Sequence, residues 1–141
     1  MAIEQLKSAD ADALRDINVL LRQISARVGE CSMELLKQII ASPESELWVA
    51  REGREIAGMA TLVLVLRPEG IAARVEDVVV RDGARGKGYG TAILEKLIER
   101  AKARGASVIQ LNSNQSRTAA NKLYQKLGFE LHETNSYELR F

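Results

Sequence analysis

The chain has 141 residues with 20 basic and 19 acidic side chains, so its formal net charge at pH 7 is only +1. This balance, without a long block of like charge, argues against a nucleic-acid partner as the main role. One cysteine and one histidine exclude an intrachain disulfide and argue against a zinc or other metal site.

Length and hydropathy further narrow the class of protein to which this chain can belong. The chain is long enough for one domain with a substantial core, and we expect residues 1–141 to form that single domain. No apolar run reaches the roughly 20 residues that span a bilayer. The first ten residues lack the pattern of a signal peptide. We therefore expect a cytoplasmic protein without a membrane partner.

Two helices are predicted near the start of the chain. Ser8 and Asp10 are candidate N-caps of the first, whose apolar stripe ends near Ser25. Ser32 is the candidate N-cap of the second, and Pro43 stops it.

Strand patterns and two further helices follow. Alternating or β-branched apolar residues predict strands, in chain order, at 3–6, 47–50, 55–66, 72–80, 107–111, 129–133 and 136–141. Gly58 inside the third indicates a bulge or a close approach. Helices are predicted after residue 90, ending near Gly105, and over 116–127. Antiparallel strands followed by a strand–helix–strand unit indicate an α/β (α+β) fold, with helices flanking a mixed sheet.

The stretch 78–94 joins a strand to a helix through a glycine-rich turn. Glycines at 86, 88 and 90 let backbone N–H groups approach a ligand, because no side chain is in the way. The helix N-terminus adds unpaired N–H donors and the positive end of the helix dipole. The sequence therefore predicts an anion site, most naturally for phosphate or pyrophosphate.

Two common phosphate-binding motifs do not match this turn. The Walker motif needs Ser or Thr after the lysine, whereas Lys87 is followed by Gly88. The dinucleotide motif G-x-G-x-x-G fails because the three glycines are spaced G-x-G-x-G. A tight strand-to-helix turn that binds no ligand is the alternative.

Two motifs resemble a known family. Arg85-x-x-Gly88-x-Gly90 resembles the pyrophosphate-loop signature of the GNAT superfamily of acetyl-CoA-dependent N-acetyltransferases. The stretch 117–129 resembles the family's helix that ends in a tyrosine followed by a Gly-Phe pair. The order of elements matches from end to end. Asp82 stands where many relatives have proline, and Arg117 where many have asparagine, which leaves the subgroup open.

The resemblance implies a GNAT fold, whose mixed sheet contains a splayed parallel pair, here 76–80 and 108–112. It implies acetyl transfer from acetyl-CoA, without a metal, to a primary amine of a small molecule or polypeptide by direct attack in a ternary complex. The residues expected to bind coenzyme A are Val78, Val79, Val80, Arg85, Gly86, Lys87, Gly88, Tyr89, Gly90, Thr91, Asn114 and Asn121. Lys87 is also compatible with a solvated side chain, and the two asparagines with helix capping.

The same resemblance assigns two catalytic roles. Tyr124 matches the general acid that protonates the leaving thiolate, with a purely packed tyrosine as the alternative. Glu76 is favoured over Asp77 as the base, directly or through water, with a surface salt bridge as its alternative. A bulge near Val78 or Val79 would aim an N–H at the thioester oxygen.

A non-catalytic module of the same fold that binds acyl-CoA as a sensor or assembly element is the competing hypothesis. The presence of both Glu76 and Tyr124 argues against it. The resemblance also allows a homodimer, because a C-terminal strand pair supplies an interface in many such folds. Nothing in the sequence identifies the acceptor amine.

Overall fold

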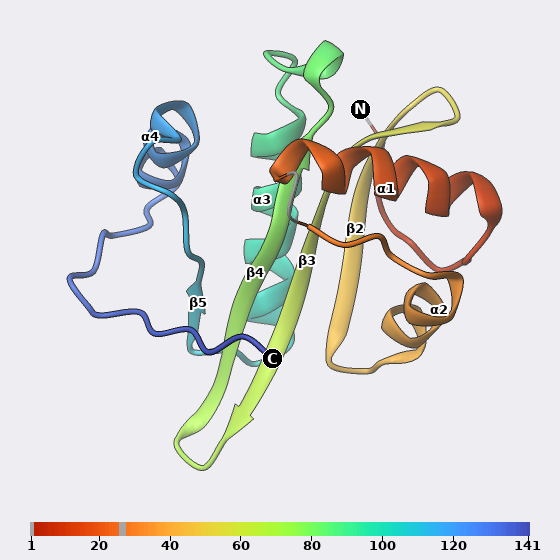
Figure 1. The fold of residues 1–141 in the computed structure, drawn as a ribbon. Helices are drawn as coiled ribbons and strands as arrows, with labels where there is room; N and C mark the ends of the chain where they lie inside the picture. Colours follow the sequence, from red (N-terminus) through yellow and green to blue (C-terminus); the bar gives the residue numbers. More distant parts are fainter. Residues whose placement is uncertain (1, 26–27) are drawn as a thin grey trace.

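The computed structural model describes residues 2–25 and 28–141. Its centre is a five-stranded sheet in the order β1-β2-β3-β4-β5 (Figure 1). The first four strands are antiparallel neighbours, and β5 runs parallel to β4. The strands are β1 (Ala2–Gln5), β2 (Ser45–Glu52), β3 (Glu55–Arg67), β4 (Gly70–Val80) and β5 (Val108–Gln110). This mixed sheet confirms the predicted α/β architecture.

Helices cover both faces of the sheet. The four α-helices are α1 (Ala11–Ile24), α2 (Met33–Ala41), α3 (Tyr89–Ala103) and α4 (Thr118–Lys126), with a short 3-10 turn η1 (Asp82–Ala84) before α3. In Figure 1, α1 and α2 lie on one side of the sheet, α3 lies on the other, and α4 stands beyond β5. Among the described residues, no helix is both long enough and apolar enough to cross a membrane.

The predicted helix boundaries follow from local capping. The Asp10 carboxylate accepts a hydrogen bond from the Ala13 N–H at 2.8 Å, so of the two candidate caps Asp10 starts α1. The Ser32 hydroxyl accepts from the Leu35 N–H at 3.0 Å and starts α2. That helix ends at Ala41, two residues before Pro43, as predicted.

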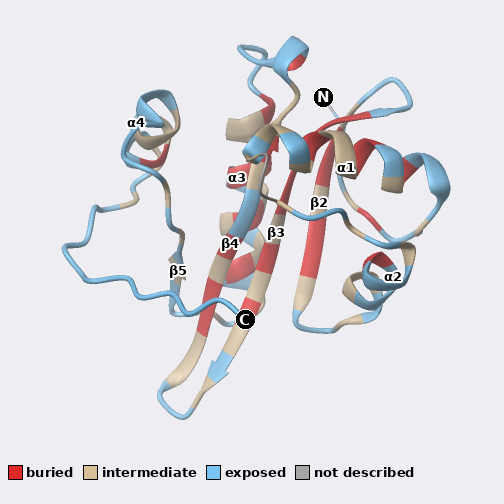
Figure 2. Ribbon diagram, in the orientation of Figure 1, coloured by how far each residue is buried: buried red, intermediate tan, exposed pale blue. Residues whose placement is uncertain are grey.

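Two apolar cores sit on the two faces of the sheet (Figure 2). Ile93, Leu94 and Leu97 of α3 are fully buried in one core, and Leu20 of α1 and Leu36 of α2 in the other. Because the first half of β3 is covered on both sides, residues 56–60 are buried without a break and none of them is polar.

Gly58 marks a close approach, as its position in the strand pattern predicted. A Cβ placed there would lie 3.1 Å from Ile93 Cδ1 and 3.3 Å from the Val79 carbonyl oxygen. A larger residue at this position would therefore require the Ile93 side chain or the Val79 backbone to shift.

A bulge lies in β4 where the sequence placed it, beside Val78. Met59 pairs with Val79 and Thr61 pairs with Glu76, so two residues of β4, Asp77 and Val78, oppose one residue of β3. Asp77 takes a φ of 53°, the left-handed region that non-glycine residues seldom adopt. The bulge turns the side chain of Asp77 away from the regular alternation of the strand.

The parallel pair is splayed, as the resemblance implied. β5 pairs with β4 only from Ala72 to Arg74 and ends at Gln110. β4 continues to Val80, so its last residues have no strand on their β5 side among the described residues. The chain beyond Gln110 diverges toward α4 (Figure 1).

The prediction of strands over 129–133 and 136–141 is wrong for this chain. Residues 129–141 form neither helix nor strand, and α4 begins at Thr118 rather than at 116. Alternating apolar residues make a strand only where a neighbouring strand supplies hydrogen bonds. In the described structure, this stretch is hydrogen-bonded to no neighbouring strand.

Candidate active site

A cleft of about 540 Å³ opens where β4 ends. The end of β4, the loop before α3, the first turn of α3 and one side of α4 form its walls, together with the end of α1. It brings together many of the predicted site residues: Val78, Val79, Val80, Arg85, Gly86, Gly88, Tyr89, Gly90, Thr91 and Tyr124. Positions almost fifty residues apart in sequence thus share one cleft.

The N-terminus of α3 faces this cleft with its N–H groups uncapped. Gly88 occupies the N-cap position with a φ of 84°, and no side chain caps the helix. Its first turn carries no acidic residue, whereas α1 and α2 each have a side-chain cap and an acid there. Gly86 also has a positive φ, 79°. Free donors, the positive helix end and a bare glycine backbone suit an anionic group.

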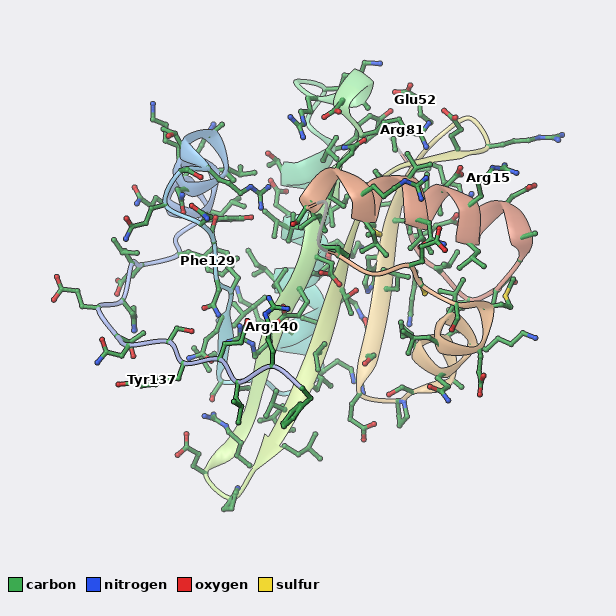
Figure 3. The ribbon with its side chains drawn as sticks, in the orientation of Figure 1. Arg15, Glu52, Arg81, Phe129, Tyr137 and Arg140 are labelled. Atoms are coloured by element: carbon green, nitrogen blue, oxygen red, sulfur yellow. The ribbon has the colours of Figure 1, made fainter. Side chains whose placement is uncertain are left out.

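The loop is tied to the neighbouring hairpin by Lys87 and Tyr89. The Lys87 ammonium lies 3.1 Å from Glu52 Oε2, and the Tyr89 hydroxyl donates to the same oxygen at 2.8 Å. Glu52 lies at the hairpin end of the sheet (Figure 3). The Tyr89 hydrogen bond lowers the pKa of Glu52, and the same bond raises the pKa of Tyr89. The Lys87 side chain does not line the cleft and instead holds the loop in place.

Gln23 of α1 fixes the start of the loop, a role that the sequence did not reveal. Its side-chain amide nitrogen, Nε2, donates to the Val80 carbonyl oxygen at 3.1 Å, and its Oε1 accepts from the Asp82 N–H at 3.3 Å. Gln23 and Ile24 also line the cleft. No local motif surrounds them, and only the packing of α1 on β4 brings them there.

Tyr124 is buried in the cleft wall, with 5% of its surface exposed. Its ring packs edge-on against Phe129, with centroids 6.1 Å apart. No hydrogen bond engages its hydroxyl among the residues that the structure describes, so the hydroxyl proton is available to a ligand. Burial raises the pKa of Tyr124, which keeps the hydroxyl protonated at neutral pH.

Asn114 lies in the turn before α4 and Asn121 lies within α4, and both lie outside the cleft lining. The Asn121 amide donates to the carbonyl oxygens of Asn114 and Arg117 at 3.0 and 2.9 Å. The Asn114 side-chain oxygen accepts from the N–H and hydroxyl of Ser116. Their bonds organise the turn that enters α4, although no side chain caps the N-terminus of that helix. Arg117, noted in the sequence only as a departure, does line the cleft.

Glu76 and Asp77 occupy different surroundings. Both residues are exposed, and Glu76 Oε1 accepts from Arg74 Nε at 3.2 Å. Asp77 lines a second cavity of about 220 Å³. Partial burial raises the pKa of Asp77, and the neighbouring charge of Glu76 raises it further.

The second cavity is mostly apolar. It lies between α1, α2 and the sheet, and its described lining residues are Ile17, Leu21, Val28, Gly29, Glu30, Cys31, Leu35, Leu36, Ile39, Leu47, Met59, Thr61 and Asp77. Asn18 of α1 fixes Cys31 in the cavity wall. Its side-chain amide donates to the Cys31 carbonyl at 3.1 Å and accepts from the Cys31 N–H at 2.7 Å. Asp77 borders this cavity and Val78, the next residue, borders the larger cleft.

Comparisons with known proteins agree with this geometry. The sequence model of the Acetyltransferase (GNAT) family matches residues 12–129. The L-methionine sulfoximine/L-methionine sulfone acetyltransferase of Pseudomonas aeruginosa is 44% identical over 64 residues, which are 45% of this chain and 37% of that protein. The uncharacterized N-acetyltransferase YvbK of Bacillus subtilis is 33% identical over 86 residues, 61% of this chain and 54% of that protein.

A solved structure, an acetyltransferase of Trypanosoma brucei, superposes with a TM-score of 0.82 at 22% identity, covering 99% of both chains. That likeness shows the fold. The matched stretches span about half or less of the two curated relatives. Because the family model matches most of this chain, the chain belongs to the GNAT acetyltransferase family.

Proposed function

We propose that this chain transfers the acetyl group of acetyl-CoA to a primary amine. The observation that carries the proposal is the pairing, in one cleft, of an uncapped glycine-rich helix N-terminus with a buried, unbonded tyrosine hydroxyl. The first suits a pyrophosphate, and the second supplies a proton. A ligand-free turn would not need the second feature.

The residues present fit coenzyme A. The backbone N–H groups around Gly86, Gly88 and the first turn of α3 would hold the pyrophosphate. The β5-facing edge of Val78–Val80 has no partner strand among the described residues, so its peptide groups suit the amides of an extended pantetheine arm. When bound, acetyl-CoA supplies the activated thioester.

The chemistry assigned to this chain is the transfer of two protons during the direct attack of the amine on the thioester. As the amine nitrogen bonds the acyl carbon, the carbon–sulfur bond breaks, and Tyr124 gives its proton to the departing sulfur. A carboxylate takes the proton that the amine loses. Glu76 was favoured from the sequence, but its carboxylate is bonded to Arg74 and lines neither the cleft nor the second cavity. We favour Asp77, because it adjoins Val78 and borders the second cavity.

We further propose that the second cavity receives the acceptor. Its aliphatic lining suits an apolar group beside the reacting nitrogen, and the Asp77 carboxylate suits an ammonium ion. The expected acceptor is therefore a primary amine on a short apolar side chain or at an apolar peptide N-terminus. The names of the relatives do not define it, because the matched stretches cover only part of those proteins.

Calorimetric titration with acetyl-CoA, followed by thiol release with an amine panel, tests the proposal. The panel contains short alkylamines, peptides with apolar N-terminal residues, an amino sugar and a free amino acid. Binding with release for the apolar amines is expected. Release only with the amino sugar would contradict the acceptor class. Binding without any release would favour the sensor alternative, and no binding would overturn the cleft assignment.

A further inference from the structure

Arg117 brings an unpaired positive charge to the large cleft. It occupies the N-cap position of α4 and lines the cleft together with residues of the glycine loop. Among the described residues, nothing forms an ion pair or a hydrogen bond with its guanidinium. Two cations of the loop are paired instead, because Arg85 lies 2.9 Å from Asp82 and Lys87 lies 3.1 Å from Glu52. The Arg117 guanidinium is therefore available to an anionic ligand in the cleft.

The backbone of Arg117 is held by hydrogen bonds, so its side chain starts from a fixed point. Its N–H donates to the Asn114 carbonyl at 3.0 Å. Its carbonyl accepts from the Asn121 N–H at 3.0 Å and from the Asn121 side-chain amide at 2.9 Å. A position that is already ordered has less conformational entropy to lose when a ligand binds. The two asparagines therefore act on the cleft through Arg117, although neither lines it.

The charges of the cleft suit a ligand with more than one anionic group. No acidic side chain is found among the described residues that line it. The uncapped start of α3 accounts for one anionic group. Burial raises the pKa of Tyr124, and the charge of Arg117 acts on the same group in the opposite direction, so this charge reaches into the cleft. Arg117 thus adds a second positive feature, on a different wall of the cleft.

The spacing along α4 places Arg117 away from the reacting sulfur. Arg117 and Tyr124 are seven residues apart, which is about two helical turns, or roughly 10 Å along the helix axis. Residues at this spacing share one face of a helix, and both line the cleft. In the proposed function Tyr124 lies beside the sulfur, and the extended arm of the coenzyme leads from the sulfur to the phosphates. The guanidinium is therefore placed for the phosphate end of the coenzyme.

We propose that Arg117 binds the 3′-phosphate of coenzyme A and makes the cleft select the complete coenzyme over 3′-dephospho-coenzyme A. This inference rests on the proposed use of acetyl-CoA. The coenzyme carries two separate anionic groups, the pyrophosphate and the phosphate on the ribose. The start of α3 takes the first, and the Arg117 guanidinium takes the second, to which it donates two parallel hydrogen bonds. Asn114 and Asn121 are then positioning residues for this contact.

Calorimetric titration with coenzyme A and with 3′-dephospho-coenzyme A tests the proposal. We expect the wild type to bind the complete coenzyme about tenfold more tightly, as one charge-assisted contact allows. Arg117→Gln should bind the complete coenzyme about tenfold more weakly, while its affinity for the dephospho form changes less than about twofold. Arg117→Lys should keep part of the selectivity, because an ammonium attracts the phosphate without the bidentate geometry.

Lys122→Gln is the matched control. It removes the same charge from the same helix, but Lys122 is exposed and lies outside the cleft lining. The selectivity of this variant should equal that of the wild type. A loss as large as that of Arg117→Gln would show a long-range effect of charge and overturn the proposal. Circular dichroism checks that the variants are folded.

The remaining outcomes separate this inference from the proposed function. Equal losses for both coenzymes in Arg117→Gln would place Arg117 at the pyrophosphate and overturn the proposal. A wild type that binds the two coenzymes equally would also overturn it, while the proposed use of acetyl-CoA would stand. A wild type that binds neither coenzyme would overturn both.

Asn121→Ala tests the positioning role. The substitution removes the side-chain bonds to the carbonyls of Asn114 and Arg117 and adds no charge. We expect the preference for the complete coenzyme to fall about threefold, with an unchanged affinity for the dephospho form. A general loss of structure would weaken both coenzymes alike. An unchanged preference would overturn the positioning role of Asn121.

Discussion

At the scale of single residues, Tyr124 is the side chain on which the chemistry depends most. Tyr124→Phe keeps the ring and its packing against Phe129 but removes the proton. We expect turnover to fall about 100-fold, within the usual contribution of a general acid, while acetyl-CoA affinity changes less than about twofold. Thiol release and calorimetry measure the two effects. Unchanged turnover would remove Tyr124 from the acid role.

The pH profile gives a second readout of the same group. Tyr124 donates only while protonated, and burial raises its pKa above the ordinary value of 10.0. Its contribution to turnover is therefore complete at neutral pH and declines only in strongly alkaline solution. The Tyr124→Phe variant should lack this alkaline decline.

A pair of matched variants distinguishes whether Asp77 or its neighbour Glu76 is the base. Asp77→Asn removes the charge at a position with φ of 53°, a conformation that asparagine tolerates well. We expect turnover with the acceptor to fall by about 100-fold or more. Glu76→Gln should stay within about twofold, since an exposed ion pair with Arg74 contributes little. The reverse result would restore Glu76 as the base.

The raised pKa of Asp77 also predicts how activity depends on pH in acid solution. A base acts in its ionised form, and the pKa of Asp77 is raised above the ordinary 3.8. Activity should therefore rise with pH through that raised pKa, and this limb should be absent from the residual activity of Asp77→Asn.

At the scale of elements, a substitution in the first turn of α3 distinguishes an effect on anion binding from an effect on helix stability. Thr91 lines the cleft in that turn, which carries no acid. Thr91→Glu adds a negative charge that favours the helix by about 0.3–1 kcal/mol. The same charge repels a pyrophosphate, so we expect acetyl-CoA affinity to fall at least about tenfold, or about 1.4 kcal/mol.

Thr91→Gln is the matched control because it has nearly the same shape without the charge. It should bind acetyl-CoA more tightly than Thr91→Glu, and neither variant should melt below the wild type by more than a few degrees. Equal binding by the two variants, measured by calorimetry, would argue against a pyrophosphate at this helix end.

At the scale of the whole molecule, Glu46 joins β2 to α3 across the sheet. It is 3% exposed, and Arg100 binds its two oxygens at 2.9 and 2.8 Å. Arg104 adds a contact at 2.6 Å. The Arg100 hydrogen bonds, helped by Trp48 and Arg104, lower the pKa of Glu46 from 4.5 to about 2.

The lowered pKa of Glu46 makes the stability of the folded protein depend on pH in a defined direction. The ionised form is stabilised in the native state, which contributes about 3 kcal/mol above pH 4.5 and is lost as the pH falls toward 2. Glu46→Gln should lower the free energy of unfolding at pH 7 by about 2–3 kcal/mol and flatten its decline in acid. Urea unfolding at several pH values measures both effects. Glu69→Gln, in an exposed pair with Arg67, should change the stability by less than about 1 kcal/mol. A similar loss in both variants would contradict the argument.

The sequence by itself determined the local features of this protein. Asp10 and Ser32 cap their helices through bonds three residues away, so the pattern there is sufficient. The glycine loop and the Tyr124 motif are likewise contiguous, and they identified the family before the fold was seen. That residues 1–141 act as one cytoplasmic domain stays a prediction.

Only the tertiary structure decided which residues meet. Gln23 reaches Val80 across 57 positions, and Lys87 reaches Glu52 across 35, so neither role follows from local spacing. The β4 bulge turns Asp77 toward the second cavity, because an extra residue breaks the regular alternation of side chains along the strand. The alternation of 136–141 predicted a strand, but a strand also needs a neighbour. Pairing depends on another backbone at hydrogen-bond distance, and no pattern within one segment can supply that.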